Sequence, residues 1–408
     1  MKIGIVAFSD YQTYPLGGGL SFLREFIRAA GELPDIDLSL VGWCVAKEDA
    51  ATRQIVQIGR RDFPFVAVGS GVPSKLIPDR AAFYSDTRSW HTSLSAIGQI
   101  DVFYCHSPES VLGVVRGGTR SPIALHLHGA SDAVGRSRFR LGRTRIVKWL
   151  YRSLALRPAL SRADAVLATV SREEHRALLS SGEVRAGVPC VRIPAMVNER
   201  FAQPVSRLES NVLRLVCVGR LEAIKGIELP IGTVAELLKR GVEARLEILG
   251  DGSERPRLER LVSDLGLSDR VTFMGTRDSE DVARIVGNAD VFVSGSRQEG
   301  FSLALIEALA VGTPAVVTNV GSATEVVLPD TTGALIEGRD AASFADAIIR
   351  VVSGGSRIRE ACRRVAQDYS SGKVSNQILD VLKGIARRPA DASSPPPDPV
   401  ATVAEGVS

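Results

Sequence analysis

Residues 296–325 read SRQEGFSLALIEALAVGTPAVVTNVGSATE, and this stretch decides the fold. A polar loop ends at Gln298–Gly300, and apolar residues at helical spacing follow over 303–309. The break Gly312–Pro314 then leads into a short apolar run at 315–317. The pattern predicts a loop, a helix, a turn and a buried strand in succession.

The loop and the start of the helix carry groups that suit one kind of ligand. Glu299 precedes the predicted helix and Glu307 lies inside it. Gly300 has no side chain, so a ligand can approach its backbone closely. Free amides at the start of the helix would attract a phosphate, namely those of Phe301, Ser302 and Leu303. The stretch therefore predicts an anion site flanked by two acceptors for hydroxyl groups, which matches the parts of a nucleotide-sugar.

The same stretch resembles the signature of the retaining, metal-independent "group 1" glycosyltransferases. Their pattern E-G-F-G/S-L-x-x-x-E-A-x-A-x-G-x-P-V-V stands here as EGFSLALIEALAVGTPAVV. Two Glu at this spacing are common by chance, whereas the whole pattern in register is specific. The alternative is a solvated loop Glu followed by a helix-surface Glu. The resemblance implies the α/β GT-B fold, with two doubly wound Rossmann-like domains facing each other across a cleft.

Length and composition agree with two soluble domains. The 408 residues exceed a typical single core, and 45% hydrophobic with 24% charged residues is ordinary for a globular protein. The five cysteines form no CxxC pair, which favours a reducing compartment. The start, MKIGIVAFSD, is typical of a strand rather than a signal peptide, and no apolar run is long enough to span a bilayer. We therefore expect a cytoplasmic protein.

Apolar runs alternate with helical patterns along the chain. In the first half the predicted strands are Lys2–Phe8, Leu38–Val41, Ile55–Ile58, Val102–Tyr104, Ile123–Leu127, Ala165–Ala168 and Cys190–Ile193. This rhythm predicts a doubly wound parallel sheet. We expect an N-terminal, acceptor-side domain at 1–194, a polar linker at 195–211 and a C-terminal, nucleotide-sugar-binding domain at 212–368. A helix at 369–386 would cross back to the first domain, and the Pro/Ser-rich tail at 387–408 would be disordered.

The second domain opens with a strand that runs straight into Gly219-Arg220, and Lys225 follows before a helix. In the resembling family this Arg and Lys hold the two phosphates of the donor. Negative charge develops on a departing diphosphate. The planar guanidinium of Arg can bind it through two hydrogen bonds, and the ammonium of Lys offers a compact positive charge. A surface Arg and Lys are the alternative.

A second glycine pair, Gly250 and Gly252, ends the next predicted strand and would line the nucleotide in the family. Asp251 between them has no second carboxylate at Asp-x-Asp spacing. We therefore predict no catalytic metal and no cofactor apart from the nucleotide-sugar co-substrate.

In the first domain, a glycine loop at 16–19 separates the first strand from a helix that begins at Leu20. The resemblance places Gly18 and Gly19 beside the donor diphosphate and the acceptor; a flexible turn is the alternative.

Three histidines lie at predicted strand ends, where ligands of such sheets gather. The family has a His-Gly near the donor sugar, so His128 is the candidate, with a hydrogen-bonded structural histidine as the alternative. For His106 and His126 the structural interpretation is favoured.

The segment 136–157 is strongly basic. Between Asp132 and Asp164 there are nine Lys or Arg and no acidic residue. Such a helix, with Ile146, Trp149, Leu150 and Leu154 on one face, suits an anionic membrane or a phosphate-bearing acceptor. The alternative is a solvated helix whose apolar side packs on the domain. Nucleic acid is not expected, because no aromatic platform accompanies the charge.

Together these features predict a glycosyltransferase that moves a sugar from a UDP- or GDP-sugar, UDP foremost, to an acceptor hydroxyl. In this assignment Glu307 holds the ribose, Glu299 the sugar hydroxyls, and Arg220 and Lys225 the departing phosphate. The basic segment suggests a lipid-linked or phosphorylated acceptor in cell-surface polysaccharide or glycolipid assembly, at the inner face of the plasma membrane. A nucleotide-sugar epimerase and a non-catalytic sugar- or membrane-binding protein are the alternatives.

Overall fold

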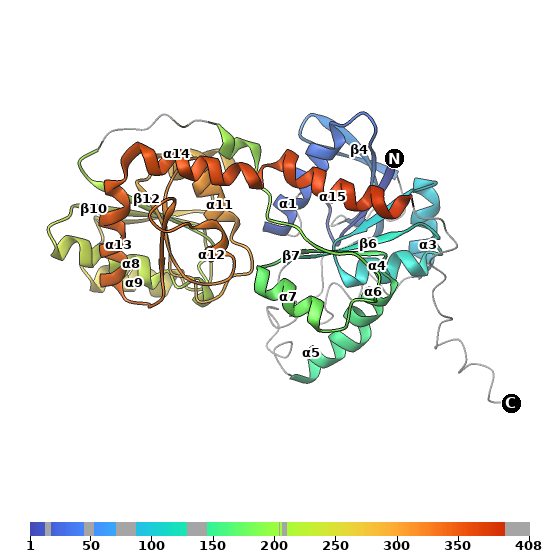
Figure 1. Cartoon of the computed structure of the whole chain (residues 1–408), viewed down its shortest axis with the longest axis horizontal. Helices are drawn as coiled ribbons and strands as arrows, with labels where there is room; N and C mark the ends of the chain where they lie inside the picture. The colour runs from blue at the N-terminus through green and yellow to red at the C-terminus, as the bar shows by residue number, and fades with distance from the viewer. Residues whose placement is uncertain are drawn as a thin grey trace.

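The computed structural model describes residues 1–12, 18–44, 53–70, 87–128, 145–203, 205 and 210–387. These residues form two domains, each built on one sheet with helices on both of its faces (Figure 1). Parts of several predicted features lie outside the described residues: Gly17 of the glycine loop, Gly129 after the candidate histidine, the first half of the basic segment and the tail from residue 388 onward.

The first domain contains an eight-stranded sheet in the order β3-β4-β2-β1-β5-β6-β7-β8. Its strands are β1 (Lys2–Val6), β2 (Asp37–Cys44), β3 (Arg53–Ile58), β4 (Arg61–Ser70), β5 (Val102–Cys105), β6 (Ile123–His128), β7 (Ala165–Thr169) and β8 (Cys190–Arg192). Its helices are α1 (Gly18–Gly31), α3 (Thr87–Ile97), α4 (Pro108–Arg116), α5 (Arg145–Tyr151), α6 (Arg157–Arg162) and α7 (Arg172–Ser180), with a π-helical turn η2 (Arg152–Leu156) between α5 and α6.

Burial explains the apolar runs in the central strands of this sheet. Every residue of β5 and β7 is buried, and two apolar clusters cover the two faces of the sheet. Because these strands are covered on both faces, their sequences are continuous apolar runs, as predicted.

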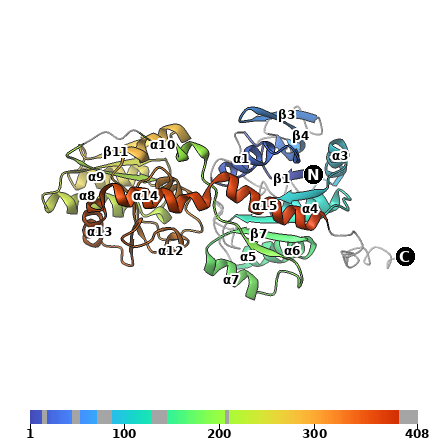
Figure 2. The ribbon, with the colours of Figure 1, turned by 45° about the horizontal axis from the view of Figure 1, so that its top comes forward.

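The prediction of a parallel sheet is wrong at one edge. The strand expected at Ile55–Ile58 is antiparallel to β4, and the two form a hairpin at the border of the sheet (Figure 2). The other neighbouring strands, which include β4 and β2, pair in parallel. β4 was not predicted from the sequence, because it contains Pro64 and proline is tolerated in sheets only near edges and bulges.

The second domain contains a six-stranded parallel sheet in the order β11-β10-β9-β12-β13-β14. Its strands are β9 (Leu213–Val218), β10 (Ala244–Leu249), β11 (Val271–Gly275), β12 (Val291–Ser294), β13 (Ala315–Thr318) and β14 (Gly333–Ile336). Its helices are α8 (Glu228–Lys239), α9 (Arg255–Asp264), α10 (Ser279–Asn288), α11 (Leu303–Ala310), α12 (Ala323–Val326), α13 (Ala341–Ser353) and α14 (Gly355–Ala366). Short 3-10 turns complete it: η3 (Glu199–Ala202), η4 (Ala223–Lys225) and η5 (Gln367–Tyr369).

Two connections join the domains. In the connection between β8 and β9, Ala195, Val197 and Phe201 are buried in an apolar cluster of the second domain. The last helix, α15 (Ser371–Ala386), then lies across the first domain (Figures 1 and 2). Its apolar side, which includes Val374 and Leu382, is buried in the same cluster as β1 and α1.

Among the residues that the structure describes, no helix is both long and apolar enough to cross a membrane.

Candidate active site

The order of the second sheet determines where a ligand can bind. The strand order reverses between β9 and β12, which are hydrogen-bonded neighbours with β10 and β13 on their outer sides. In doubly wound sheets the crevice at such a switch point, beyond the carboxyl ends of the strands, is the binding site. The loop after β9 carries Arg220 and Lys225, and the loop after β12 carries Glu299. The topology therefore brings the predicted cations and the first predicted carboxylate to one place.

Contacts between these two loops hold Lys225 and Glu299 together. The Lys225 Nζ donates to Glu299 Oε1 at 2.5 Å, and the side chains are 24% and 16% exposed. A backbone hydrogen bond also joins the two loops: the Arg297 amide donates to the Ile224 carbonyl at 2.8 Å. Gly226 adopts a left-handed conformation (φ 57°), and a Cβ there would lie 2.1 Å from the Gly295 carbonyl oxygen. Glycine thus permits the close approach that sets Lys225 against the Glu299 loop.

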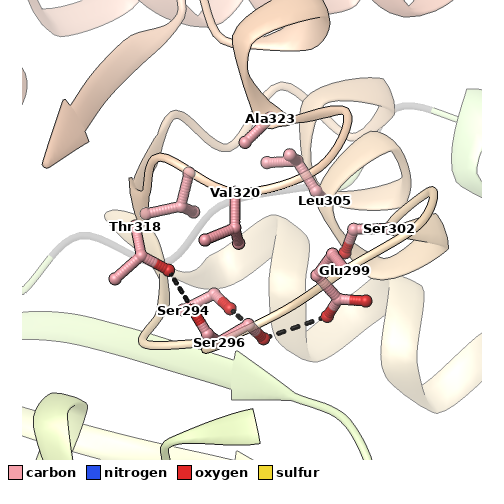
Figure 3. A pocket seen from close by; sticks show the side chains of 9 residues that line it. Ser294, Ser296, Glu299, Ser302, Leu305, Thr318, Val320 and Ala323 are labelled. Carbon is pink, nitrogen blue, oxygen red and sulfur yellow. Dashed lines mark hydrogen bonds between the residues drawn. The ribbon is translucent and has the colours of Figure 1, made fainter. Parts of the chain in front are cut away.

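Two hydroxyl groups fix the Glu299 side chain and its loop (Figure 3). The Ser296 Oγ donates to Glu299 Oε1 at 2.9 Å. Thr318 at the end of β13 donates to the Ser296 carbonyl at 2.6 Å. A small pocket opens beside them, lined in part by Ser302, Val320 and the Glu299 carboxylate itself. Sequence reasoning missed Ser296 and Thr318, because Ser and Thr in loops carry no signal of their own.

The start of α11 lies directly after this loop. Ser302 is the N-cap residue and its side chain forms no capping hydrogen bond, so the first amides of the helix lack that partner. The Phe301 ring packs beside Tyr369, with ring centroids 5.9 Å apart. The Arg192 guanidinium lies 5.8 Å from the centroid of the Phe301 ring. Gly300 is buried, and its carbonyl accepts from the Ser322 amide. The predicted amide site of Phe301, Ser302 and Leu303 therefore stands next to Glu299.

Arg220 and the predicted glycines lie at the ends of β9 and β10. The Arg220 side chain is exposed and pairs with no carboxylate among the described residues. Gly250 has φ 126°, and a Cβ there would lie 2.0 Å from the Gly219 carbonyl oxygen. A Cβ at Gly252 would likewise meet the Leu221 backbone at 2.4 Å. Close packing of two backbones thus already requires these glycines, so their contact with a nucleotide stays a prediction.

Glu307 lies in the second turn of α11. Burial raises the pKa of its carboxyl from 4.5 to about 7, and no hydrogen bond of its side chain is found among the described residues. A half-buried carboxyl without a hydrogen-bond partner among the described residues is suited to accept hydrogen bonds from hydroxyl groups of a ligand. Its predicted role at the ribose stays a prediction.

In the first domain, His128 ends β6 and its side chain is exposed. Its Nε2 lies 2.7 Å from Nδ1 of His106, which follows β5. The edge of the Phe22 ring, on α1, contacts His128 with centroids 5.1 Å apart. Gly18 and Gly19 form the first turn of α1, one turn before Phe22, and not a loop as expected. Part of the glycine loop is thus helical and lies on the His128 side of the domain.

Three histidines form the one group of possible metal ligands found in the described residues, namely His106, His126 and His128. The arrangement does not favour a metal. His126 already uses both ring nitrogens, with Tyr104 and with Thr169, and its ring stacks on that of His128 with centroids 4.2 Å apart. In the second domain, Asp251 is exposed and paired with Arg255 at 3.0 Å.

Glu325 joins the carboxyl ends of the two sheets and was not predicted. It lies on α12, and its side chain is 6% exposed. Its Oε1 accepts from the Arg172 amide, which opens α7 in the first domain, at 2.7 Å. Its Oε2 pairs with Arg192 at the end of β8, the residue that also contacts Phe301.

The described part of the basic segment exposes its apolar side chains. No residue of α5 is buried, and the large exposed side chains on α5 and η2 are Ile146 (70%), Trp149 (64%), Leu150 (39%) and Leu154 (66%). The alternative in which this face packs on the domain is therefore wrong. Arg152 and Arg157 both pair with Glu183.

Comparison with known proteins agrees with this geometry. A model of the family described as "Glycosyl transferases group 1" matches residues 198–368. The D-inositol 3-phosphate glycosyltransferase of Corynebacterium urealyticum is 31% identical over 213 residues, 47% of this chain and 50% of the relative. A GDP-mannose-dependent alpha-(1-6)-phosphatidylinositol dimannoside mannosyltransferase of Mycobacterium tuberculosis is 36% identical over 193 residues, 47% of this chain and 48% of the relative. The chain thus spans about half the length of these curated relatives.

Solved structures extend the likeness to both domains. Sucrose-phosphate synthase from Thermosynechococcus elongatus superposes with a TM-score of 0.75 at 21% identity, covering 94% of this chain and 98% of the other. HepE from Anabaena, in complex with UDP-glucose, superposes with a TM-score of 0.66 at 18% identity, covering 94% and 100%. These likenesses establish the predicted GT-B fold. Residues 198–368 of the second domain thus resemble the glycosyl transferases group 1 family.

Proposed function

We propose that the protein moves a sugar from a nucleotide-diphosphate donor to an acceptor hydroxyl, with retention of configuration and without a metal. One observation carries the proposal: Lys225 and Glu299 are in contact at the switch point of the second sheet, next to the start of α11. A cation and free helix amides suit a departing phosphate, whereas a carboxylate suits sugar hydroxyls.

Each candidate residue has one role in this reaction. Arg220, Lys225 and the amides of residues 301–303 stabilise the charge that develops on the departing diphosphate. One such donor is worth about 3 kcal/mol in comparable oxyanion sites. Glu299 orients the sugar, Glu307 holds the ribose and His128 lies at the reacting face. No carboxylate is assigned as a nucleophile, so we propose that the acceptor attacks from the side of the leaving phosphate, which takes its proton.

We propose a UDP-sugar as the donor. The structural relative HepE was solved with UDP-glucose, whereas the mycobacterial sequence relative depends on GDP-mannose. Thermal-shift measurements with UDP, GDP and ADP separate these bases. A stabilisation by UDP that exceeds the other two supports this assignment, and a preference for GDP contradicts it.

We further propose that the protein works at the inner face of the plasma membrane, on a lipid-linked or phosphorylated acceptor of polysaccharide or glycolipid assembly. The support is the surface formed by Ile146, Trp149, Leu150 and Leu154, hereafter the α5 surface, which is exposed beside Arg145 and Lys148. Apolar side chains that enter the lipid boundary and cations that meet anionic headgroups are the two components of interfacial binding.

The rival functions differ in their products. An epimerase would convert the donor with no acceptor present, and a binding protein would convert nothing. The test incubates the protein with UDP- and GDP-sugars, with and without a membrane lipid extract, in buffer that contains either EDTA or Mg²⁺. We expect acceptor-dependent release of nucleoside diphosphate, with a retained linkage in the product and an equal rate in EDTA. Epimerised donor, or a rate that requires Mg²⁺, would contradict the proposal.

A further inference from the structure

The three histidines of the first domain form a stacked cluster at the carboxyl ends of β5 and β6. The His106 and His128 rings are 5.0 Å apart and nearly parallel, at 15°. Phe22 contacts His126 and His128 edge-on, each at 5.1 Å between centroids. The Tyr104 and His106 rings also touch, with centroids 4.3 Å apart. Packing on several sides therefore sets the orientation of these rings.

The hydrogen bond between His106 Nδ1 and His128 Nε2, 2.7 Å long, needs one proton and one lone pair. The other nitrogen of His106, Nε2, is buried and has no hydrogen-bond partner in the described part of the chain. If His128 donated, His106 would carry its proton on Nε2, as a buried N–H group with no acceptor. Orphaned buried N–H groups are rarer in proteins than under-satisfied acceptors. The favoured arrangement therefore has His106 donating from Nδ1, with its Nε2 unprotonated.

Burial favours the neutral form of the two histidines beside His128. Burial and the neighbouring imidazoles lower the pKa of both His106 and His126. Among the described residues, Tyr104 and Thr169 contact His126 and Phe22 contacts His128, and burial raises the pKa of the Tyr104 phenol. A protonated His128 would have to donate from Nε2, which forces the orphaned N–H on His106. The hydrogen bond from His106 therefore favours the neutral form of His128.

We propose that His106 is a positioning residue: its Nδ1–H donates to His128 Nε2 and holds His128 as the neutral tautomer with its proton on Nδ1. The consequence for catalysis rests on the proposed function. A neutral N–H donor of fixed orientation can bind an uncharged sugar hydroxyl. An imidazolium would instead attract the diphosphate, which belongs to Arg220 and Lys225.

The first test reads the tautomer directly in the free protein. Long-range ¹H–¹⁵N NMR correlations of the histidine rings, recorded from pH 5 to 8.5, report which nitrogen carries the proton. The chain has five histidines, so single substitutions assign the signals. We expect His128 to give the signals of the Nδ1–H form. Observation of the Nε2–H form in the wild-type protein would overturn the proposal, whatever the enzyme's activity.

Two substitutions separate positioning from packing. His106→Asn keeps an amide donor near the place of Nδ1, whereas His106→Phe keeps the ring and removes the donor. We expect the Phe variant to shift His128 towards the Nε2–H form. The Asn variant should retain the wild-type signals. An unchanged tautomer of His128 in His106→Phe would exclude the positioning role.

Activity gives an independent readout once a donor is known. We expect His106→Phe to lower kcat about tenfold, within the range of one proton-positioning contact, with little change in the affinity for the nucleoside diphosphate. His106→Asn should restore kcat, and the Phe substitution should have no further effect in a His128→Ala background. A loss of kcat with an unchanged His128 tautomer would contradict the inference. A protein with no transferase activity but the expected tautomer would leave it intact and remove the proposed function.

Discussion

At the scale of single residues, the centre of the candidate site is the ion pair of Lys225 with Glu299. The proposed donor must replace this ion pair with its own contacts to the two side chains. In the free protein, the Lys225 ammonium is bound by the Glu299 carboxylate, and both are largely shielded from solvent. In the proposed reaction a diphosphate would compete for Lys225, and sugar hydroxyls would compete for Glu299. The pair keeps both side chains at the proposed site in the free protein, and donor binding would replace their mutual contact with contacts to the ligand.

The exposed guanidinium of Arg220 allows a clean test of the phosphate role. We expect Arg220→Ala to lower kcat by about 100-fold, because one charge-stabilising donor at a departing oxyanion is worth that much. The melting temperature should change little, since Arg220 pairs with no carboxylate in the described part of the chain. Steady-state kinetics and thermal melts measure the two quantities. Arg350→Ala on the exposed side of α13 is the matched control, and equal turnover in both variants would remove Arg220 from the site.

Glu307 predicts a pH dependence of both stability and donor binding. Burial raises its pKa from 4.5 to about 7 in the folded protein. Its contribution to stability is therefore present below pH 4.5 and is lost as the pH rises to 7. A rise of this size corresponds to about 3 kcal/mol. Glu307→Gln should thus stabilise the free protein at pH 8 and have little effect at pH 4.5, as measured by chemical denaturation.

The affinity for the donor should depend on pH in the opposite direction: it should increase as Glu307 ionises, whereas the stability of the free protein decreases. The ionised carboxylate is the better acceptor for ribose hydroxyls, so the affinity for the nucleotide should rise as the pH passes through 7. In Glu307→Gln this rise should disappear and binding should be weak throughout, as isothermal titration calorimetry can measure. A wild-type pH profile that persists in the Gln variant would assign the titration to another group.

The sequence predicts the residues of this site better than their contacts. The signature motif identifies Glu299, and the strand-end pattern identifies Lys225, because both stand in sequence patterns that local chemistry explains. Their mutual contact depends on the pairing of β9 with β12, which joins segments about 75 residues apart. His106 was assigned a structural role for the same reason, since only the fold brings it to His128.

At the scale of elements, the α5 surface is an apolar feature that stays exposed in the described part of the fold. The run from α5 through η2 to α6 is helical, yet only its second half is buried against the domain. Figure 1 shows α5 at the lower margin of the first domain, away from α15. Exposed tryptophan, leucine and isoleucine side chains in one helical run are rare on a protein without a binding partner at that place.

The membrane proposal is tested by removing apolar area from this surface. We expect the wild-type protein to sediment with vesicles that contain anionic phospholipid, and the double variant Trp149→Gln/Leu154→Gln to lose about tenfold in partition. Burial of two large apolar side chains in the lipid boundary contributes enough free energy to account for at least a tenfold change in the partition coefficient. Ile55→Gln, an equally exposed apolar residue on β3, is the control. Equal sedimentation of the double variant and the wild type would show that the surface does not bind lipid.

Elements were predictable where burial dictates the pattern and unpredictable at the sheet edge and at helix starts. Continuous apolar runs identified the central strands, including β5 and β7, because these are covered on both faces. β4 was missed because Pro64 interrupts its pattern. The start of α1 was placed two residues late, since two glycines oppose helix formation and only tertiary packing offsets this.

At the scale of the whole molecule, the two-domain fold was predictable and the contact between the domains was not. Alternating strands and helices with a signature motif imply the architecture, and the solved relatives agree. One part of the contact is made by Glu325, a residue with no distinguishing context in the sequence. It binds Arg192 and the first amide of α7, both in the other domain. Arg192 also lies against Phe301, so the orientation of the domains is linked to the loop that begins α11.

The link through Glu325 predicts that domain orientation and donor binding change together. Glu325→Gln keeps the shape of the side chain and removes the charge that Arg192 needs. Truncating one partner of a buried charge pair at an interface costs about 2 kcal/mol or more. We therefore expect a larger radius of gyration in small-angle X-ray scattering and a several-fold rise in KM for the donor. Glu360→Gln, exposed on α14, should change neither quantity. If the variant keeps the wild-type scattering but loses affinity, Glu325 acts locally on the α11 loop. If neither quantity changes, the pair does not hold the domains.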